Sequence, residues 1–231
     1  MSPDIAENAF LLILHRDKEL LNIISLSLEV SGSALILSTM LGLPLAALLG
    51  LKEFPMKEFI VTVMNTFMGF PPVVLGLILY ILLSRNGLFG FMELLYTPTA
   101  MIMAQFFLSF PIIVSLCHAA IVSVDPIIKQ TATTLGATRF QMGVTVIAEA
   151  RYGIMSGIIA AFGRLMAEVG AILIVGGNIA GYTRVMTTTI AMETDKGNFE
   201  LGLALGIILL SISMFINLLL HRLQKRRDFR N

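Results

Sequence analysis

Long apolar stretches that contain no charged residue dominate the chain. Four of them, residues 30–51, 59–84, 94–124 and 201–220, lack Asp, Glu, Lys and Arg. Because a helix needs about 20 residues to cross the hydrocarbon core of a bilayer, each stretch predicts a membrane span. The third stretch is too long for one straight span, so we expect it to cross over residues 98–119 and then to enter a loop.

A fifth span is expected over residues 153–175, where two charged side chains interrupt the apolar pattern. Arg164 and Glu168 are four residues apart, so one continuous helix would place them on the same face, where they can pair. A charge in mid-membrane is costly and usually faces protein or water. The pair is therefore interpreted either as a structural ion pair or as part of a gate. The whole pattern predicts an all-α polytopic membrane protein with five transmembrane helices, forming one domain over residues 1–231.

The composition supports a membrane protein and excludes several other classes. Hydrophobic residues make up 56% of the chain and charged residues 13%, against roughly 25% charged residues in soluble domains. A cytosolic enzyme, a disordered protein and a nucleic-acid binder are therefore excluded. The single cysteine, Cys117, and the three scattered histidines give no disulfide framework and no metal site. We expect no catalytic residue.

The distribution of Lys and Arg orients the five spans. The tail after the last span holds five of them, Arg222, Lys225, Arg226, Arg227 and Arg230. Since cytoplasmic segments are enriched in Lys and Arg, the C-terminus is expected in the cytoplasm, and five spans then place the N-terminus outside. The cytoplasmic segments would then hold ten Lys and Arg, and the outer segments five.

A loop of about 30 residues, 121–151, lies on the expected cytoplasmic side. Asp125 and Pro126 predict a helix start, because a carboxylate caps the first turn and proline is favoured at the first helical position. Gly136 is placed to end that helix. A second amphipathic segment follows, with Phe140 and Val144 on one side. The loop has two interpretations: a connector lying on the membrane, or a docking element for a cytoplasmic partner.

The second span contains Pro71 and Pro72, which remove two backbone donors and predict a break in the helix. The carbonyl groups freed by such a break need protein or water partners. The break is interpreted either as a packing kink or as the constriction of a transport path.

The loop resembles the cytoplasmic EAA loop of ABC importer permeases. The family's Glu-Ala-Ala-x-x-x-Gly corresponds to residues 130–136, in which the alanine at the third position and the closing glycine are kept. Two of the three EAA residues and the later Leu-Pro are changed. The resemblance implies that this loop couples the permease to an ATPase subunit through Asp125, Pro126, Gln130, Thr131, Ala132, Leu135, Gly136, Ala137, Thr138 and Arg139.

Three further segments resemble permeases of molybdate and sulfate importers, in the same order along the chain: residues 70–77, residues 163–171 and the Gly177-Asn178-Ile179 segment. Residues 175–191 look most like tungstate permeases. The resemblance implies a type I ABC importer permease core. The candidate path or gate residues are Pro71, Pro72, Arg164, Glu168 and Asn178. Asn178 is interpreted either as an uncharged donor for a tetrahedral oxyanion or as the cap of a short outer helix.

The resemblance also implies partners and a substrate. The chain contains no Gly-x-x-x-x-Gly-Lys-Ser/Thr sequence, so ATP and Mg²⁺ are expected on two separate ATPase subunits and no cofactor on this chain. A second copy of the chain, an extracytoplasmic oxyanion-binding protein and membrane lipid complete the expected partners. We expect a tungstate importer permease in a bacterial or archaeal cell membrane. Molybdate and sulfate permeases are the alternatives within this class, and a secondary carrier is the alternative outside it.

Overall fold

The computed structural model describes residues 18–228, with side chains up to residue 218. Within that range every regular element is helical. The elements are α2 (Lys18–Leu51), α3 (Lys57–Met68), α4 (Pro72–Leu83), the short 3-10 helix η1 (Gly90–Met92), α5 (Pro98–Val122), α6 (Pro126–Thr134), α7 (Arg139–Glu149), α8 (Arg151–Met166), α9 (Gly170–Gly176), α10 (Met186–Asp195) and α11 (Phe199–Asp228).

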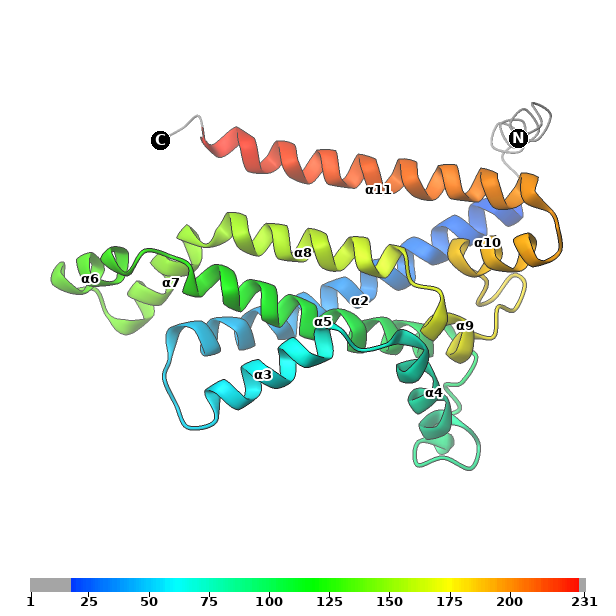
Figure 1. The fold of residues 1–231 in the computed structure, drawn as a ribbon, viewed down its shortest axis with the longest axis horizontal. Helices are drawn as coiled ribbons and strands as arrows, with labels where there is room; N and C mark the ends of the chain where they lie inside the picture. Colours follow the sequence, from blue (N-terminus) through cyan, green and yellow to red (C-terminus); the bar gives the residue numbers. More distant parts are fainter. Residues whose placement is uncertain (1–17, 229–231) are drawn as a thin grey trace.

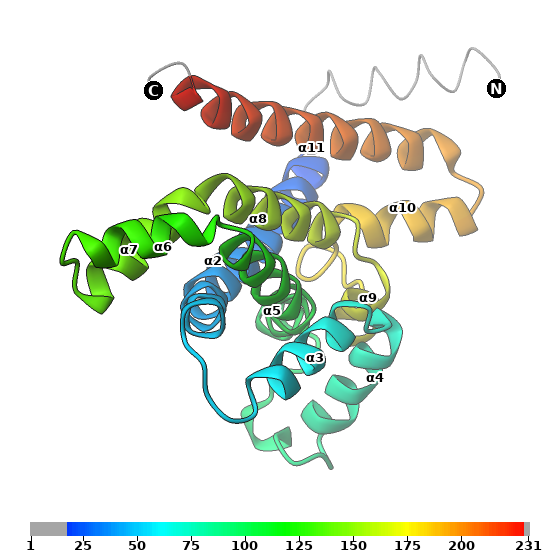
Figure 2. The same cartoon turned by 60° about the vertical axis from the view of Figure 1, so that its left-hand side comes forward.

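The longest helices, α2, α5, α8 and α11, run broadly along the long axis of the molecule, while α4 projects sideways (Figure 1). α6 and α7 lie at one end, and α10 lies at the other. α2 begins at the α10 end, and α11 finishes near the α6–α7 end (Figures 1 and 2). The described chain therefore starts and finishes at opposite ends of the helical body, as an odd number of crossings requires.

α5 forms the centre of the fold. In its most apolar 18-residue window 67% of the residues are buried, against 33% for α2 and 17% for α11. α5 packs closely on α2 because small residues let the two backbones approach: a Cβ added at Gly42 would lie 3.1 Å from Ile113, and the Ser38 and Ser109 hydroxyls meet across the contact. Small residues and hydroxyl pairs are the usual contacts between helices in a bilayer. Over residues 199–218, α11 buries little of its apolar surface and leaves Leu210, Met214 and Phe215 exposed, as expected of a lipid-facing helix.

The break at the two prolines is confirmed. α3 ends at Met68, Pro71 precedes α4 in an extended conformation, and Pro72 occupies the first turn of α4. The two helices meet at an angle of 101°. The prediction for the third span is also confirmed, since α5 covers 98–122 with Pro111 inside it.

The prediction of one continuous helix over 153–175 is wrong. α8 ends at Met166 and α9 begins at Gly170. The reason lies in Glu168, which precedes the N-cap residue Val169: its side chain accepts the backbone N–H of Ala171 at 3.0 Å and so satisfies the first turn of a new helix. Among residues 18–228, three helices are long and apolar enough to cross a bilayer, and up to five spans result if the bent pairs α3–α4 and α7–α8 each count as one.

Substituting Gly76 tests the contact between α4 and α9. A Cβ at Gly76 would lie 2.9 Å from the backbone Cα of Ala171, whereas a Cβ at Gly32 in α2 meets nothing within 4 Å. We expect Gly76→Ala to destabilise the protein by about 1–3 kcal/mol, because overpacking forces the backbones apart. Gly32→Ala is the matched control and should be neutral or slightly stabilising. Thermal unfolding in detergent measures both, and equal midpoints would contradict the tight packing of α4 on α9.

Candidate functional site

The break between α8 and α9 is built around a buried carboxylate. Glu168 is only 2% exposed. One of its oxygens, Oε2, pairs with Nη1 of Arg164 at 3.1 Å, and the other accepts the N–H of Ala171. The side chain of Arg164 is 40% exposed, so the cation can be reached from outside the core. The predicted pairing is confirmed, although Glu168 lies beyond the end of the helix that carries Arg164.

Side chains from two other helices donate hydrogen bonds to backbone carbonyls at this break. Gln105 of α5 donates from Nε2 to the carbonyl oxygen of Leu165 at 3.2 Å. Thr187 of α10 donates from its hydroxyl to the carbonyl oxygen of Glu168 at 2.7 Å. The carbonyl of Leu165 also accepts the backbone N–H of Glu168 at 3.1 Å, so Gln105 adds a second bond there. Thr187 supplies a donor to the carbonyl of Glu168, and an unpaired backbone group at membrane depth would cost several kcal/mol.

Sequence reasoning missed Gln105. The available signal was a lone amide in an otherwise apolar span, because a buried polar side chain is normally hydrogen-bonded to a specific partner. Gln105 is 1% exposed, so the structure places it fully inside.

The break between α3 and α4 lies next to the break between α8 and α9. A Cβ added at Gly170, the first residue of α9, would lie 2.8 Å from a methyl group of Val73 in the first turn of α4. The helix that follows the two prolines therefore packs on the helix that Glu168 caps. The structure therefore places the first turn of α4, which begins at Pro72, next to the start of α9. A role of these residues in a path or gate stays a prediction.

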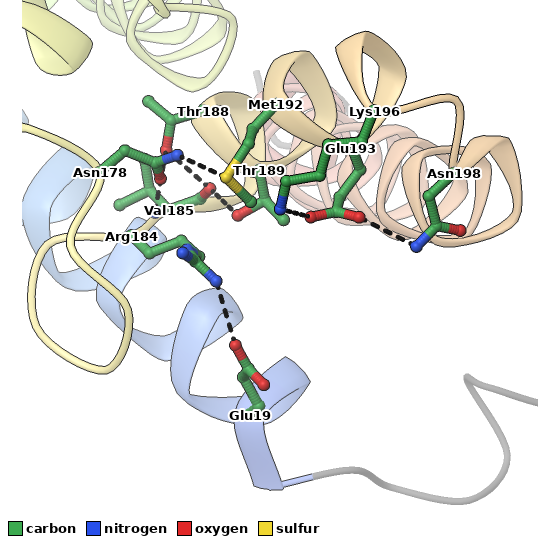
Figure 3. A network of polar contacts seen from close by, with 10 residues as sticks. All are labelled: Glu19, Asn178, Arg184, Val185, Thr188, Thr189, Met192, Glu193, Lys196 and Asn198. Carbon is green, nitrogen blue, oxygen red and sulfur yellow. Dashed lines mark hydrogen bonds and ion pairs between the residues drawn. The ribbon is translucent and has the colours of Figure 1, made fainter.

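Asn178 is held by a different set of contacts. Its backbone has a φ of +50°. Its Oδ1 accepts a hydrogen bond from the Thr188 hydroxyl at 2.9 Å, and its Nδ2 lies 3.3 Å from the sulfur of Met192 (Figure 3). Thr188 follows Thr187 directly, so neighbouring residues of α10 bind Asn178 and the carbonyl of Glu168. The role of Asn178 in a path stays a prediction, since these side-chain contacts run to α10.

Ion pairs and hydrogen bonds connect the helices at the α10 end of the molecule (Figure 3). Arg184 pairs with Glu19 at 3.3 Å and ties the segment after α9 to the start of α2. Glu193 accepts hydrogen bonds from Lys196 and from Asn198, both at 2.9 Å, across the turn between α10 and α11. The bond from Lys196 is the main reason that the pKa of the Glu193 carboxyl is lowered. Asn198 and the nearby charge of Arg184 act in the same direction, against the burial that would raise it.

The loop at the opposite end has the two helices and the glycine junction that the sequence predicts. Asp125 caps α6 by accepting the N–H of Ile127 at 2.9 Å, and Pro126 is the first residue of the helix. Gly136 follows the helix with a φ of +79°, in the left-handed region that favours glycine. Thr138 and Gln141 then form a reciprocal capping box at the start of α7.

The loop presents apolar side chains to the outside. Ile127 is 63% exposed, Leu135 82% and Phe140 79%. Large exposed apolar side chains that cluster in this way mark an interaction surface. The other predicted coupling residues are exposed or half-buried on the same loop: Asp125, Pro126, Gln130, Thr131, Ala132, Gly136, Ala137, Thr138 and Arg139.

Comparison with known proteins identifies the class. Residues 42–229 match the family described as "Binding-protein-dependent transport system inner membrane component". The chain belongs to this family, and it is an inner-membrane, multi-pass transport component.

Individual relatives indicate which permeases of this family the chain resembles. The chain is 43% identical to the "Probable anion ABC transporter permease protein" of Haloferax volcanii, over 92% of this chain and 94% of that protein. It is 39% identical to the "Tungstate uptake system permease protein TupB" of Peptoclostridium acidaminophilum, over 93% and 94% of the two chains. The molybdenum permease ModB of Escherichia coli is 32% identical, over 87% and 93%.

Solved structures confirm the fold. An amino acid ABC transporter chain is similar with a TM-score of 0.67 at 19% identity, covering 94% of this chain and 98% of that one. A bacterial alginate ABC transporter, solved in complex with a periplasmic protein, is similar with a TM-score of 0.72 at 20% identity, covering 94% and 82%. The expected all-α fold of a type I ABC importer permease is thereby confirmed.

A double-mutant cycle tests the pairing of Arg164 and Glu168. We expect Arg164→Gln alone to destabilise strongly, because removing one partner of a buried ion pair costs about 3–5 kcal/mol, reduced here by the partial exposure of Arg164. The double variant Arg164→Gln, Glu168→Gln should lose less than the sum of the two single variants. Unfolding in detergent measures the cycle, and strictly additive losses would show that the two side chains do not interact.

The lowered pKa of Glu193 predicts a pH dependence. Because the pKa is lower in the folded protein, ionised Glu193 stabilises the fold above its ordinary value of 4.5, and this contribution is lost as the pH falls through the lower folded value. The difference in free energy of unfolding between wild type and Glu193→Gln should therefore be largest near neutral pH and shrink below about pH 4. A difference that stays constant from neutral to acidic pH would refute the role of the ionised carboxylate.

Proposed function

We propose that this chain is the membrane-spanning permease subunit of an ATP-driven importer for tungstate. The observation that carries the proposal is its identity, 39% and 36%, to two proteins named as tungstate uptake system permeases, each matched over more than 90% of both chains. Molybdate is the second candidate substrate, because the named molybdenum permease matches at lower identity, 32%. A named sulfate permease matches at 28%.

The proposed path for the oxyanion runs past the junction of α4 and α9, between two copies of the chain. Two features support this position. α4 exposes Val73, Val74 and Leu77, although its other face is packed against α9. The partly exposed guanidinium of Arg164 lies at the same junction and supplies a positive charge that attracts a dianion, while Glu168 keeps that attraction weak enough for release.

The proposed coupling surface is the α6–α7 loop. Its exposed Ile127 and Leu135 and its rigid helix caps suit a surface that transmits movement from an ATPase subunit. In this arrangement the α6–α7 end faces the cytoplasm and the α10 end faces outward, toward an oxyanion-binding protein. ATP and Mg²⁺ bind to two partner ATPase subunits. The cationic tail, Arg222, Lys225, Arg226, Arg227 and Arg230, agrees with this orientation by its sequence, and its side chains lie outside those the structure describes.

Uptake by cells tests the substrate. The chain is expressed with its ATPase and binding protein in cells that lack their own tungstate and molybdate importers, and cellular W, Mo and S are counted by mass spectrometry. We expect W uptake that survives an excess of molybdate and sulfate. Equal uptake of W and Mo would assign a shared oxyanion importer instead, and no uptake by an assembled complex would refute the proposed substrates.

Substituting Gly136 tests the coupling surface. Gly136→Arg adds a large side chain and strains the left-handed backbone at φ +79°, and we expect it to abolish ATP-driven uptake while the protein still inserts into the membrane. Gly136→Asn is the matched control, because asparagine tolerates this conformation, and it should keep most of the activity. Normal uptake by Gly136→Arg would contradict the assignment of the α6–α7 loop to coupling.

A further inference from the structure

A groove of about 740 Å³ opens at the α6–α7 end of the molecule, between the end of α2 and one side of α7. It is lined by Leu51, Lys52, Glu53, Arg139, Phe140, Met142, Gly143, Val144 and Ile147. Most of the wall is apolar, and the charged residues come from the chain after α2 and from the first residue of α7.

The groove exists because α7 packs on α2 through its smallest residue. A Cβ added at Gly143 would lie 3.1 Å from Leu51, the last residue of α2. Gly143 and Val146 are buried in this contact, whereas Phe140 and Val144 stay exposed. α7 therefore shows a second apolar face beside the end of a candidate membrane span, as helices that lie in a membrane interface do.

The charges at the groove are unbalanced. Among the residues with described side chains, neither Lys52 nor Arg139 has an ion pair. The one acidic residue of the wall, Glu53, is already paired with Lys57 at 2.7 Å. Two cations are thus left beside an apolar wall, next to the last residue of the candidate span α2.

We propose that this groove binds a phospholipid with an anionic headgroup. The headgroup phosphate binds Lys52 and Arg139, and an acyl chain packs against Phe140 and Val144. A lipid is favoured over an ATPase subunit because the groove wall includes the end of the spanning helix itself, where a bilayer supplies both the negative charge and the apolar chain. The ATPase still has the exposed Ile127 and Leu135, which do not line the groove. Arg139, which the sequence resemblance placed in the coupling loop, is here assigned to the lipid. The proposal does not depend on which oxyanion is transported.

Native mass spectrometry of the purified full chain in detergent tests the site. The protein is titrated with phosphatidylglycerol and with phosphatidylcholine of identical acyl chains. Each Lys or Arg near an anionic lipid contributes an attraction that corresponds to about a fivefold change in affinity. We expect the wild type to retain phosphatidylglycerol in preference to phosphatidylcholine, and Lys52→Gln to bind phosphatidylglycerol about fivefold more weakly.

Lys129→Gln is the matched control, because it removes the same charge from α6, outside the groove. It should leave the affinity for phosphatidylglycerol unchanged. Equal retention of the two lipids by the wild type, or equal losses in Lys52→Gln and Lys129→Gln, would overturn the proposal. Release of phosphatidylglycerol when the ATPase subunits assemble on the chain would also overturn it, since the groove would then belong to the ATPase contact.

Discussion

A single buried carboxylate, that of Glu168, sits where a helix ends inside the apolar body, and its hydrogen bonds fix the arrangement around it. An unpaired charge or a free backbone carbonyl at this depth would be strongly unfavourable. Arg164 neutralises the carboxylate, the N–H of Ala171 uses its second oxygen, and the hydroxyl of Thr187 binds its backbone carbonyl. Residues from α8, α9 and α10 therefore meet at one point, and α5 joins them through Gln105.

This junction connects the parts of the protein that a permease has to move together. α9 begins at the carboxylate and packs on α4, which itself begins at the proline break. α8 runs from the same junction to α7 and the α6–α7 loop, the proposed coupling surface (Figure 2). α7 and α8 meet at an angle of 61°. A change in this angle would move α8, and α8 would transmit the movement to the α4–α9 contact at its other end.

The sequence predicts most of the architecture because its signals are local. Charge-free stretches predict the spans, Pro71 and Pro72 predict the break before α4, and Asp125 with Gly136 predicts the bounds of α6. The break after Met166 was not predicted, because Arg164 and Glu168 at four-residue spacing are typical of an intact helix. The carboxylate of Glu168 binds the N–H of Ala171 and so favours the break. Gln105 and Thr187, which are distant in sequence and are brought there only by the fold, add hydrogen bonds to carbonyls at the break. Contacts between residues that are distant in sequence, and not the local sequence pattern alone, determine the structure of such a site.

Thiol labelling at Val73 tests most directly whether the α4–α9 junction lines an aqueous path. The native Cys117 is fully buried, so one introduced cysteine can be followed. In proteoliposomes of the assembled transporter, Val73→Cys should react with a charged, membrane-impermeant thiol reagent at a rate that changes when ATP is added. Leu210→Cys, on the exposed apolar face of α11, should react only with a lipid-soluble reagent. If Val73→Cys behaves like Leu210→Cys, α4 faces lipid and the proposed path is wrong.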